Sequence, residues 1–129
     1  MYDGYCLAER ESPSSLVFVQ SGIASWYGRE EQGKPTANGE TYNRHELTAA
    51  SRKLPFNSIV RVTNENNGRS VQVRINDRGP YADDDRIIDV SSAAADILQM
   101  KKAGIVPVEL EIVSLGGPGR ERALAVSAP

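Results

Sequence analysis

The sequence predicts a mainly β fold on the basis of three observations. Two neighbouring segments alternate apolar and polar side chains, which is typical of strands with one buried face. The 129 residues include 11 glycines and 7 prolines, which supply turns between short strands. Only the segment 91–102 shows apolar residues at helical spacing. We therefore expect many short strands and one or two short helices.

The two alternating segments, 59–64 and 70–76, are predicted to form a β-hairpin. The connection at 65–69 contains Asn67 and Gly68. Both residue types readily adopt the positive φ angles that tight hairpin turns need, so the turn is expected to centre on them.

Three further strands are predicted at 23–27, 87–90 and 106–113. The last strand shows the clearest alternation of the three, because acidic residues separate its apolar ones. Its alternating residues are Val108, Glu109, Leu110, Glu111 and Ile112.

The helical segment carries signals at both of its ends. Its apolar positions are Ala94, Ile97 and Leu98. They follow Ser91, a residue type that caps helix N-termini well. Gly104 is expected to end the helix, because glycine is favoured just beyond the last turn.

The chain is the usual size for one domain. We expect residues 1–20 to form a partly disordered leader that contains at most one edge strand. Residues 21–113 are predicted to be the folded domain. Residues 114–129 are rich in glycine and small residues, and we expect a flexible tail there.

Charge and cysteine content exclude several functions. A formal net charge of -2 provides no basic surface for nucleic acid, so no nucleic-acid partner is expected. Cys6 is the only cysteine, so one chain can form neither a disulfide nor a cysteine-based zinc site. No segment has the roughly 20 apolar residues that span a bilayer. Membrane attachment is expected only through a lipid anchor at Cys6, whose alternative is a free surface thiol.

Two carboxylates are candidate site residues. Glu40 directly follows Gly39, whose turn can bring the carboxylate to the face of a cleft. Asp77 lies where a predicted strand ends in the polar cluster 76–80. Each has an alternative interpretation. Glu40 is otherwise a solvated turn residue, and Asp77 a structural acceptor of backbone N–H groups or a partner of Arg78.

Six motifs between residues 24 and 91 resemble the rare-lipoprotein-A family in order and spacing. They are Ala24-Ser25-Trp26-Tyr27-Gly28, Thr36-Ala37-Asn38-Gly39-Glu40, Thr48-Ala49-Ala50, Leu54-Pro55-Phe56, Asn76-Asp77-Arg78-Gly79-Pro80 and Arg86-Ile87-Ile88-Asp89-Val90-Ser91. The resemblance implies a six-stranded double-psi β-barrel. It also implies a groove in which Glu40 and Asp77 match the family's acidic residues.

Members of that family include endolytic lytic transglycosylases, which cut between N-acetylmuramic acid and N-acetylglucosamine and leave a 1,6-anhydro end. The resemblance implies this activity on peptidoglycan glycan strands, in the bacterial periplasm or anchored to the outer membrane. Asp77 is expected to be the acid/base, and Glu40 to orient substrate or stabilise positive charge. We expect a monomer that needs no cofactor or metal.

Five further residues are predicted to bind substrate. Aromatic rings stack on sugar rings, although Trp26 also suits a core position. The predicted substrate-binding residues are Trp26, Asn38, Tyr42, Arg78 and Tyr81.

The sequence departs from the family at Ser51, where the family's Thr-Ala-Ala-His segment has histidine. Serine exchanges hydrogen bonds but does not carry the positive charge of an imidazolium. We assign Ser51 to the catalytic set, as a natural loss, a tolerated replacement or an engineered change. A loss would leave a catalytically impaired, expansin-like glycan-binding barrel. A protease-inhibitor-like barrel is a third interpretation.

Overall fold

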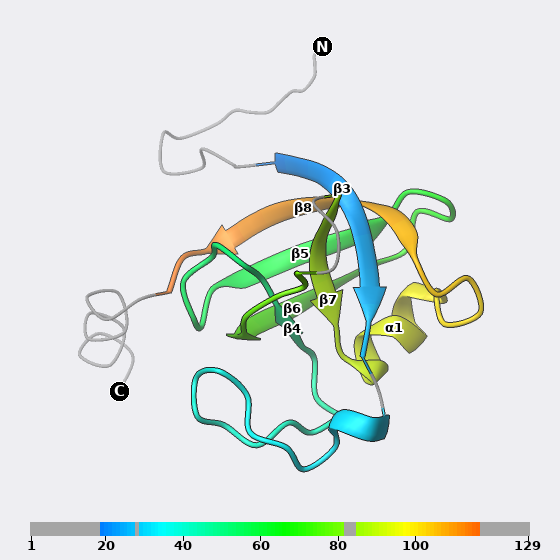
Figure 1. The fold of residues 1–129 in the computed structure, drawn as a ribbon. Coiled ribbons are helices and arrows are strands. Elements are labelled where there is room, and N and C mark those ends of the chain that lie inside the picture. The colour runs from blue at the N-terminus through cyan, green and yellow to red at the C-terminus, as the bar shows by residue number, and fades with distance from the viewer. Residues whose placement is uncertain (1–18, 28, 82–84, 117–129) are drawn as a thin grey trace.

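The computed structural model describes residues 19–27, 29–81 and 85–116, and within them six strands close into a barrel (Figure 1). The strands are β3 (Val19–Trp26), β4 (Thr48–Ala50), β5 (Ile59–Asn64), β6 (Ser70–Asp77), β7 (Arg86–Val90) and β8 (Val106–Ser114). They are joined by one short 3-10 helix, η2 (Arg29–Glu31), and one α-helix, α1 (Ser92–Leu98). The predicted fold class is confirmed.

The strand order around the barrel is β3-β7-β4-β6-β5-β8, and β8 pairs with β3 to close it. The pairs β3–β7 and β4–β6 are parallel, whereas the remaining pairs are antiparallel. A barrel with these two parallel pairs agrees with the double-psi topology that the sequence resemblance implied.

The predicted hairpin is formed by β5 and β6, whose burial alternates along both strands. The hairpin loop differs from the prediction in one respect. Gly68 has the expected positive φ of 78°, but Asn67 does not adopt one. Instead, the Asn67 side chain accepts from Arg69 N and donates to the carbonyl of Leu98, which ties the loop to α1.

The barrel interior holds a single apolar core. Along β5 and β6 its members alternate with outward-facing residues, which is why the sequence pattern located them. The largest fully buried apolar core side chains are Ile75, Ile88, Leu98, Met100, Val60, Val62, Val73, Val90 and Val108.

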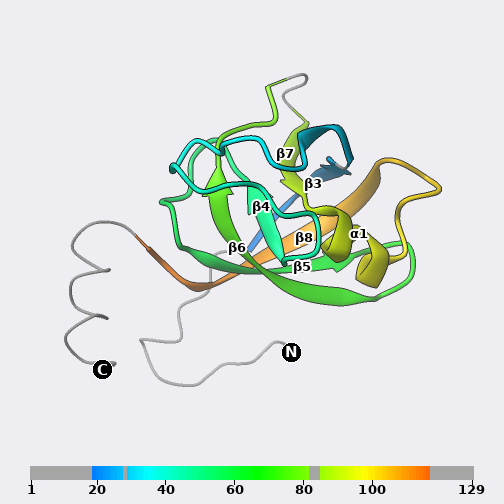
Figure 2. The same ribbon diagram turned by 90° about the horizontal axis from the view of Figure 1, so that it is seen from below.

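Helix α1 covers one end of the barrel and is shorter than predicted (Figure 1 and Figure 2). The Ser91 side chain caps it as expected, by accepting from Ala94 N. It ends at Leu98, because Gln99 takes a left-handed conformation with a φ of 54°. The chain then turns so that Met100 is buried in the core, while Ile97, one of the apolar residues at helical spacing, is 38% exposed.

Strand β4 was not predicted from side-chain pattern, because all three of its residues are buried and show no alternation. Strand β3 begins at Val19, two residues before the predicted start of the folded domain at 21. The predicted lipid anchor at Cys6 and most of the predicted tail lie outside the described residues. No helix within the described residues is long and apolar enough to cross a bilayer.

Candidate functional site

The two predicted carboxylates are brought together by the loop 36–40, which crosses the end of β6. Gly39 has a φ of 94°, a conformation that glycine adopts without strain, and this lets Thr36 N donate to the carbonyl of Glu40. The loop is attached to β6 where Asn38 N donates to the carbonyl of Asn76, at 3.3 Å. Sequence spacing thus predicted the turn, and the structure places it against β6.

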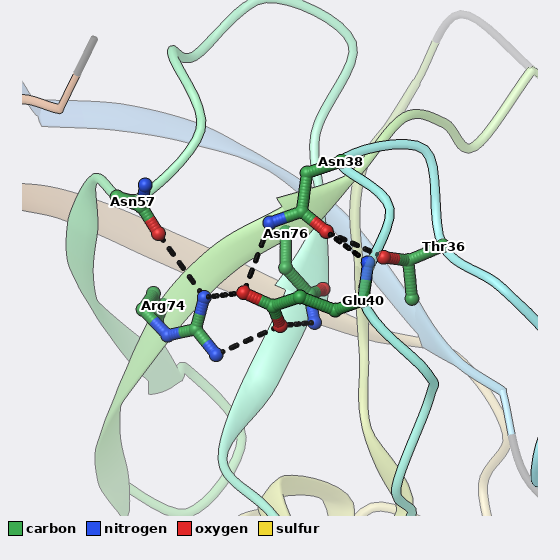
Figure 3. A network of polar contacts seen from close by, with 6 residues as sticks. All are labelled: Thr36, Asn38, Glu40, Asn57, Arg74 and Asn76. Carbon is green, nitrogen blue, oxygen red and sulfur yellow. Dashed lines mark hydrogen bonds and ion pairs between the residues drawn. The ribbon is translucent and has the colours of Figure 1, made fainter. Parts of the chain in front are cut away.

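Glu40 is held by a network of side chains (Figure 3). Arg74 donates from both terminal nitrogens, at 2.7 Å to Oε2 and 2.9 Å to Oε1. Asn76 Nδ2 donates to Oε1 at 3.1 Å, and Asn38 Nδ2 donates to Oε2 at 3.0 Å. Asn57 in turn accepts from Arg74, at 3.1 Å. Both carboxylate oxygens therefore have two donors each.

These donors fix the charge of Glu40. The hydrogen bonds from Arg74, with smaller contributions from Asn76 and Asn38, lower the pKa of Glu40 to about 2, although partial burial opposes the shift. Glu40 is consequently an anion at every pH where the protein would work. It can stabilise positive charge or hold Arg74 in place, but it cannot serve as a proton donor.

Asp77, the last residue of β6, is held differently. Its Oδ1 accepts from Ala37 N and from Arg78 N, each at 2.9 Å. No hydrogen bond from the described residues ends on Oδ2. The structural role considered for Asp77 is therefore present, yet it occupies one oxygen only. The other oxygen remains available for proton transfer to a ligand.

Arg78 and Ser51 connect Asp77 to the loop after β4. Arg78 donates from Nη1 to the carbonyl of Ser51 at 3.2 Å, and its guanidinium lies 3.9 Å from the centre of the Phe56 ring. Ser51 N donates to the carbonyl of Asp77 at 3.1 Å. Arg78 is thus engaged in positioning this loop, in addition to any contact with a ligand.

The Ser51 side chain points into its own turn. It is 4% exposed, and its oxygen accepts from Lys53 N and Leu54 N, at 3.3 and 3.1 Å. The backbone N–H groups of the turn thus use the Ser51 oxygen as an acceptor, while a hydroxyl can still donate its own proton. The assignment of Ser51 to the catalytic set stays a prediction.

Of the predicted aromatic residues, Tyr42 is the most deeply buried. It is 1% exposed, its hydroxyl donates to the carbonyl of Tyr27 and accepts from Ser92 N, and it therefore belongs to the interior. Tyr81 is 72% exposed and free to meet a ligand. Trp26 is partly buried against the core, with Lys101 Nζ 5.0 Å from its ring centre.

Arg74 was missed by sequence reasoning. It is separated from Glu40 by 34 positions, and its alternation with buried Val73 and Ile75 marked it only as an outward-facing strand residue. Among the described residues, no group of three histidine, cysteine, aspartate or glutamate side chains is arranged to hold a metal ion.

The chemistry available at this site is proton transfer beside a fixed negative charge. Asp77 offers one oxygen to a ligand, while Glu40 stays ionised next to Arg74 and near Asp77. Such an arrangement suits cleavage reactions in which a proton is donated and positive charge develops on the substrate.

Comparison with known proteins identifies relatives across this whole site. The family model described as "Lytic transglycolase" matches residues 19–110. The endolytic peptidoglycan transglycosylase RlpA of Campylobacter jejuni is 55% identical over 95 residues, which cover 74% of this chain and 34% of that protein. Its Vibrio cholerae counterpart is 47% identical over 105 residues, covering 81% and 40% respectively. The chain thus spans well under half the length of these relatives.

Solved structures show the same fold at lower identity. The expansin of Clavibacter michiganensis has a TM-score of 0.60 at 21% identity, over 78% of this chain and 54% of that one. The Streptomyces papain inhibitor has a TM-score of 0.59 at 22% identity, over 74% and 94%. Both likenesses concern the barrel alone, because one fold hosts unrelated functions.

Proposed function

We propose, because this chain belongs to the lytic transglycolase family, that its barrel cleaves the glycan strands of peptidoglycan by endolytic transglycosylation. Relatives with about half of their matched residues identical bear the name of that activity. The observation that carries the proposal is the unequal treatment of the two carboxylates. Glu40 is held as an anion, whereas one oxygen of Asp77 has no hydrogen-bond partner among the described residues.

Asp77 is the acid/base of the proposed reaction. It donates a proton to the oxygen that links N-acetylmuramic acid to N-acetylglucosamine, and the bond from that oxygen to C1 of N-acetylmuramic acid breaks. The 6-hydroxyl oxygen of the same sugar then bonds to C1, and its proton passes to the Asp77 carboxylate. The product is a 1,6-anhydro end, and no water or cofactor is consumed.

Glu40 assists without transferring a proton. Positive charge develops on the sugar ring as the bond breaks, and a fixed anion nearby stabilises it. Arg74 and Asn76 keep the carboxylate oriented, at 2.7 to 3.1 Å. Asn38, predicted to bind substrate, acts in this proposal through its bond to Glu40.

The proposed substrate gives the proposed location. Glycan strands of peptidoglycan lie in the bacterial cell envelope, so we assign the protein to that compartment, with the glycan as its partner. The relatives named for peptidoglycan cleavage support this assignment. Tyr81, at the exposed edge of the site, is the aromatic residue best placed to stack on a sugar.

The second candidate is a barrel that binds glycan without cleaving it. One observation favours it: position 51, adjacent to Asp77 through a 3.1 Å backbone hydrogen bond, carries a serine whose hydroxyl is occupied in a turn. No imidazole can then adjust the charge of Asp77 from that position.

Digestion of purified peptidoglycan separates these two candidates. Incubation should release anhydro-muropeptides, which mass spectrometry distinguishes from hydrolytic products by the loss of one water. Sacculi with intact peptide stems and sacculi stripped of stems should be digested in parallel. Binding in a pull-down without anhydro products would favour the binding barrel, whereas neither binding nor cleavage would reject both.

A further inference from the structure

Four strands carry a row of residues that links Asp77 to a second partly buried carboxyl, that of Asp89. Ser25 of β3 pairs with Asp89 of β7, Asp89 pairs with Ala50 of β4, and Ala50 pairs with Asp77 of β6. Neighbouring strands lie about 4.8 Å apart, so Asp77 and Asp89 are separated by about 10 Å between their Cα atoms. Only the methyl group of Ala50 stands between them in the row.

The row faces away from the barrel core. The residues that precede Ser25, Asp89 and Ala50 are Ala24, Ile88 and Ala49, and each of these three is 0% exposed and belongs to the core. Successive side chains of a strand point to opposite faces, so Ser25, Asp89 and Ala50 face outward. Asp77 pairs with Ala50 where the register of β4 and β6 is irregular, and its charge reaches Asp89.

Asp89 has one oxygen engaged and lacks a cationic partner within the described residues. Ser25 Oγ donates to Asp89 Oδ1 at 3.1 Å. The charge of Arg86 acts on Asp89, but no ion pair joins the two residues. Ser25 and Arg86 also line an open depression of about 700 Å³, together with Trp26 and Tyr27. Asp89 is thus connected to this depression through its hydrogen bond from Ser25.

The surroundings of Asp89 favour its neutral form. Burial raises the pKa of the Asp89 carboxyl to about 6, and the charges of Glu31 and Asp77 add to the shift. The hydrogen bond from Ser25 and the charge of Arg86 oppose it only in part. A neutral carboxyl donates one hydrogen bond, which the ionised form cannot do.

Tyr27, which borders the same depression, does not compete for this proton. Burial, together with the charges of Asp77 and Asp89, raises the pKa of Tyr27 far above its ordinary value. Tyr27 therefore stays neutral while Asp89 titrates.

We propose that Asp89 is a substrate-binding residue of the same site as Asp77, donating a hydrogen bond from Oδ2 to a hydroxyl or amide oxygen of the bound glycan. The inference rests on the proposed function, because it takes the glycan strand as the ligand. It assigns Asp89 a role in binding and leaves proton transfer to Asp77.

The test compares Asp89→Asn with Asp89→Ala between pH 5 and 8. The asparagine amide donates a hydrogen bond at every pH, whereas alanine donates none. For the unaltered protein, KM on peptidoglycan should rise between pH 6 and 8 and approach tenfold per unit at the upper end. In Asp89→Asn that rise should vanish, and in Asp89→Ala KM should be high throughout. At any one pH, the kcat values of the three proteins should differ by less than threefold.

Loss of kcat in Asp89→Asn at constant KM would overturn the proposal and make Asp89 a proton donor. A pull-down on sacculi, with every protein also carrying Asp77→Asn to prevent cleavage, gives a second readout. Binding that weakens above pH 6 with Asp89 present, and not with asparagine there, supports the proposal even if the unaltered protein does not cleave. Binding that is independent of pH overturns the role of Asp89 alone. No binding by any form overturns the proposed function as well.

Discussion

Glu40 lies in a region of the site where it is paired with a cation, whereas Asp77 and Asp89 lie in a region where, among the described residues, neither forms an ion pair. Glu40 receives four hydrogen bonds from three side chains, and one of those side chains is a cation (Figure 3). Asp77 receives two bonds from backbone N–H groups, and Asp89 receives one from a serine hydroxyl.

The two regions differ in whether their carboxylates serve stability or chemistry. A compensated carboxylate holds the loop 36–40 on β6 and is difficult to protonate. Uncompensated carboxyls can exchange protons and hydrogen bonds with a ligand, but they cost stability when buried. Changes to the first region should therefore act mainly on folding, and changes to the second mainly on activity.

The largest expected effect is that of Asp77→Asn. The amide is nearly isosteric but has no proton to transfer, so cleavage should fall by about 100- to 10,000-fold. The melting temperature should change little, because both N–H donors still find a carbonyl oxygen. Mass spectrometry of anhydro products measures the first effect and calorimetry the second. Undiminished cleavage by this variant would show that Asp77 is not the acid.

Ser51→His should supply an imidazole, which can carry positive charge, at a position next to Asp77. Ser51 N donates to the carbonyl of Asp77, and Ser51 lines an open depression of about 630 Å³. If the unaltered protein cleaves weakly, release of anhydro products should rise by about tenfold, less than a fully supported acid-base group gives. Ser51→Asn, polar but never charged, is the control. An equal gain in both variants would mean that charge is not the missing property.

Glu40→Gln should lower cleavage less than Asp77→Asn and should cost stability. The free energy of unfolding should fall by about 1 to 2 kcal/mol at pH 7. This is less than the full pKa shift of Glu40 implies, because solvent screens its ion pair with Arg74. The control is Glu111→Gln, which breaks a single contact to Arg61 at 2.7 Å. Both glutamate side chains are 37% exposed, so any difference reflects the additional partners of Glu40.

Acid titration sharpens the same comparison. The pKa of Glu40 is lower in the folded protein than its usual 4.5, so its stabilisation is present above pH 4.5 and is lost as the pH falls toward 2. In urea unfolding between pH 5 and 2, the free energy of unfolding of Glu40→Gln should approach that of the unaltered protein as the pH falls.

The cleavage assays test the assignment of roles. Equal losses of cleavage in Glu40→Gln and Asp77→Asn would indicate that the roles of the two residues are misassigned.

Asp89→Asn should have the opposite effect on stability. Its pKa rises from 3.8 to about 6 on folding, so the unaltered protein loses stability as the pH rises from 3.8 to 6. The variant avoids this loss and should be more stable by about 1 to 3 kcal/mol at pH 8, with no gain at pH 3. Asp96→Asn, at a side chain that is 65% exposed and paired with Lys101, should give no comparable gain. Urea unfolding at both pH values measures these differences.

The elements with a regular side-chain pattern could be predicted from the sequence. Strands 59–64 and 70–76 alternate because one face of each lines the core, and their hairpin was located to the residue at Gly68. The six-stranded barrel was implied by the resemblance of the motifs to the rare-lipoprotein-A family. Strand β4 has three buried residues and no alternation, so its side-chain pattern alone did not reveal it.

The sequence by itself therefore determined the fold class, the hairpin, the helix cap and the two turns that carry Glu40 and Asp77, because each depends on neighbours within a few residues. Only the tertiary structure decided the charge state of Glu40, the burial of Tyr42 and the placement of Asp89 two strands from Asp77. Each of these depends on a partner more than ten residues away in the chain. Arg74 meets Glu40 across 34 positions, and Asp89 joins the row through Ala50, because closure of the barrel brings β4, β6 and β7 side by side.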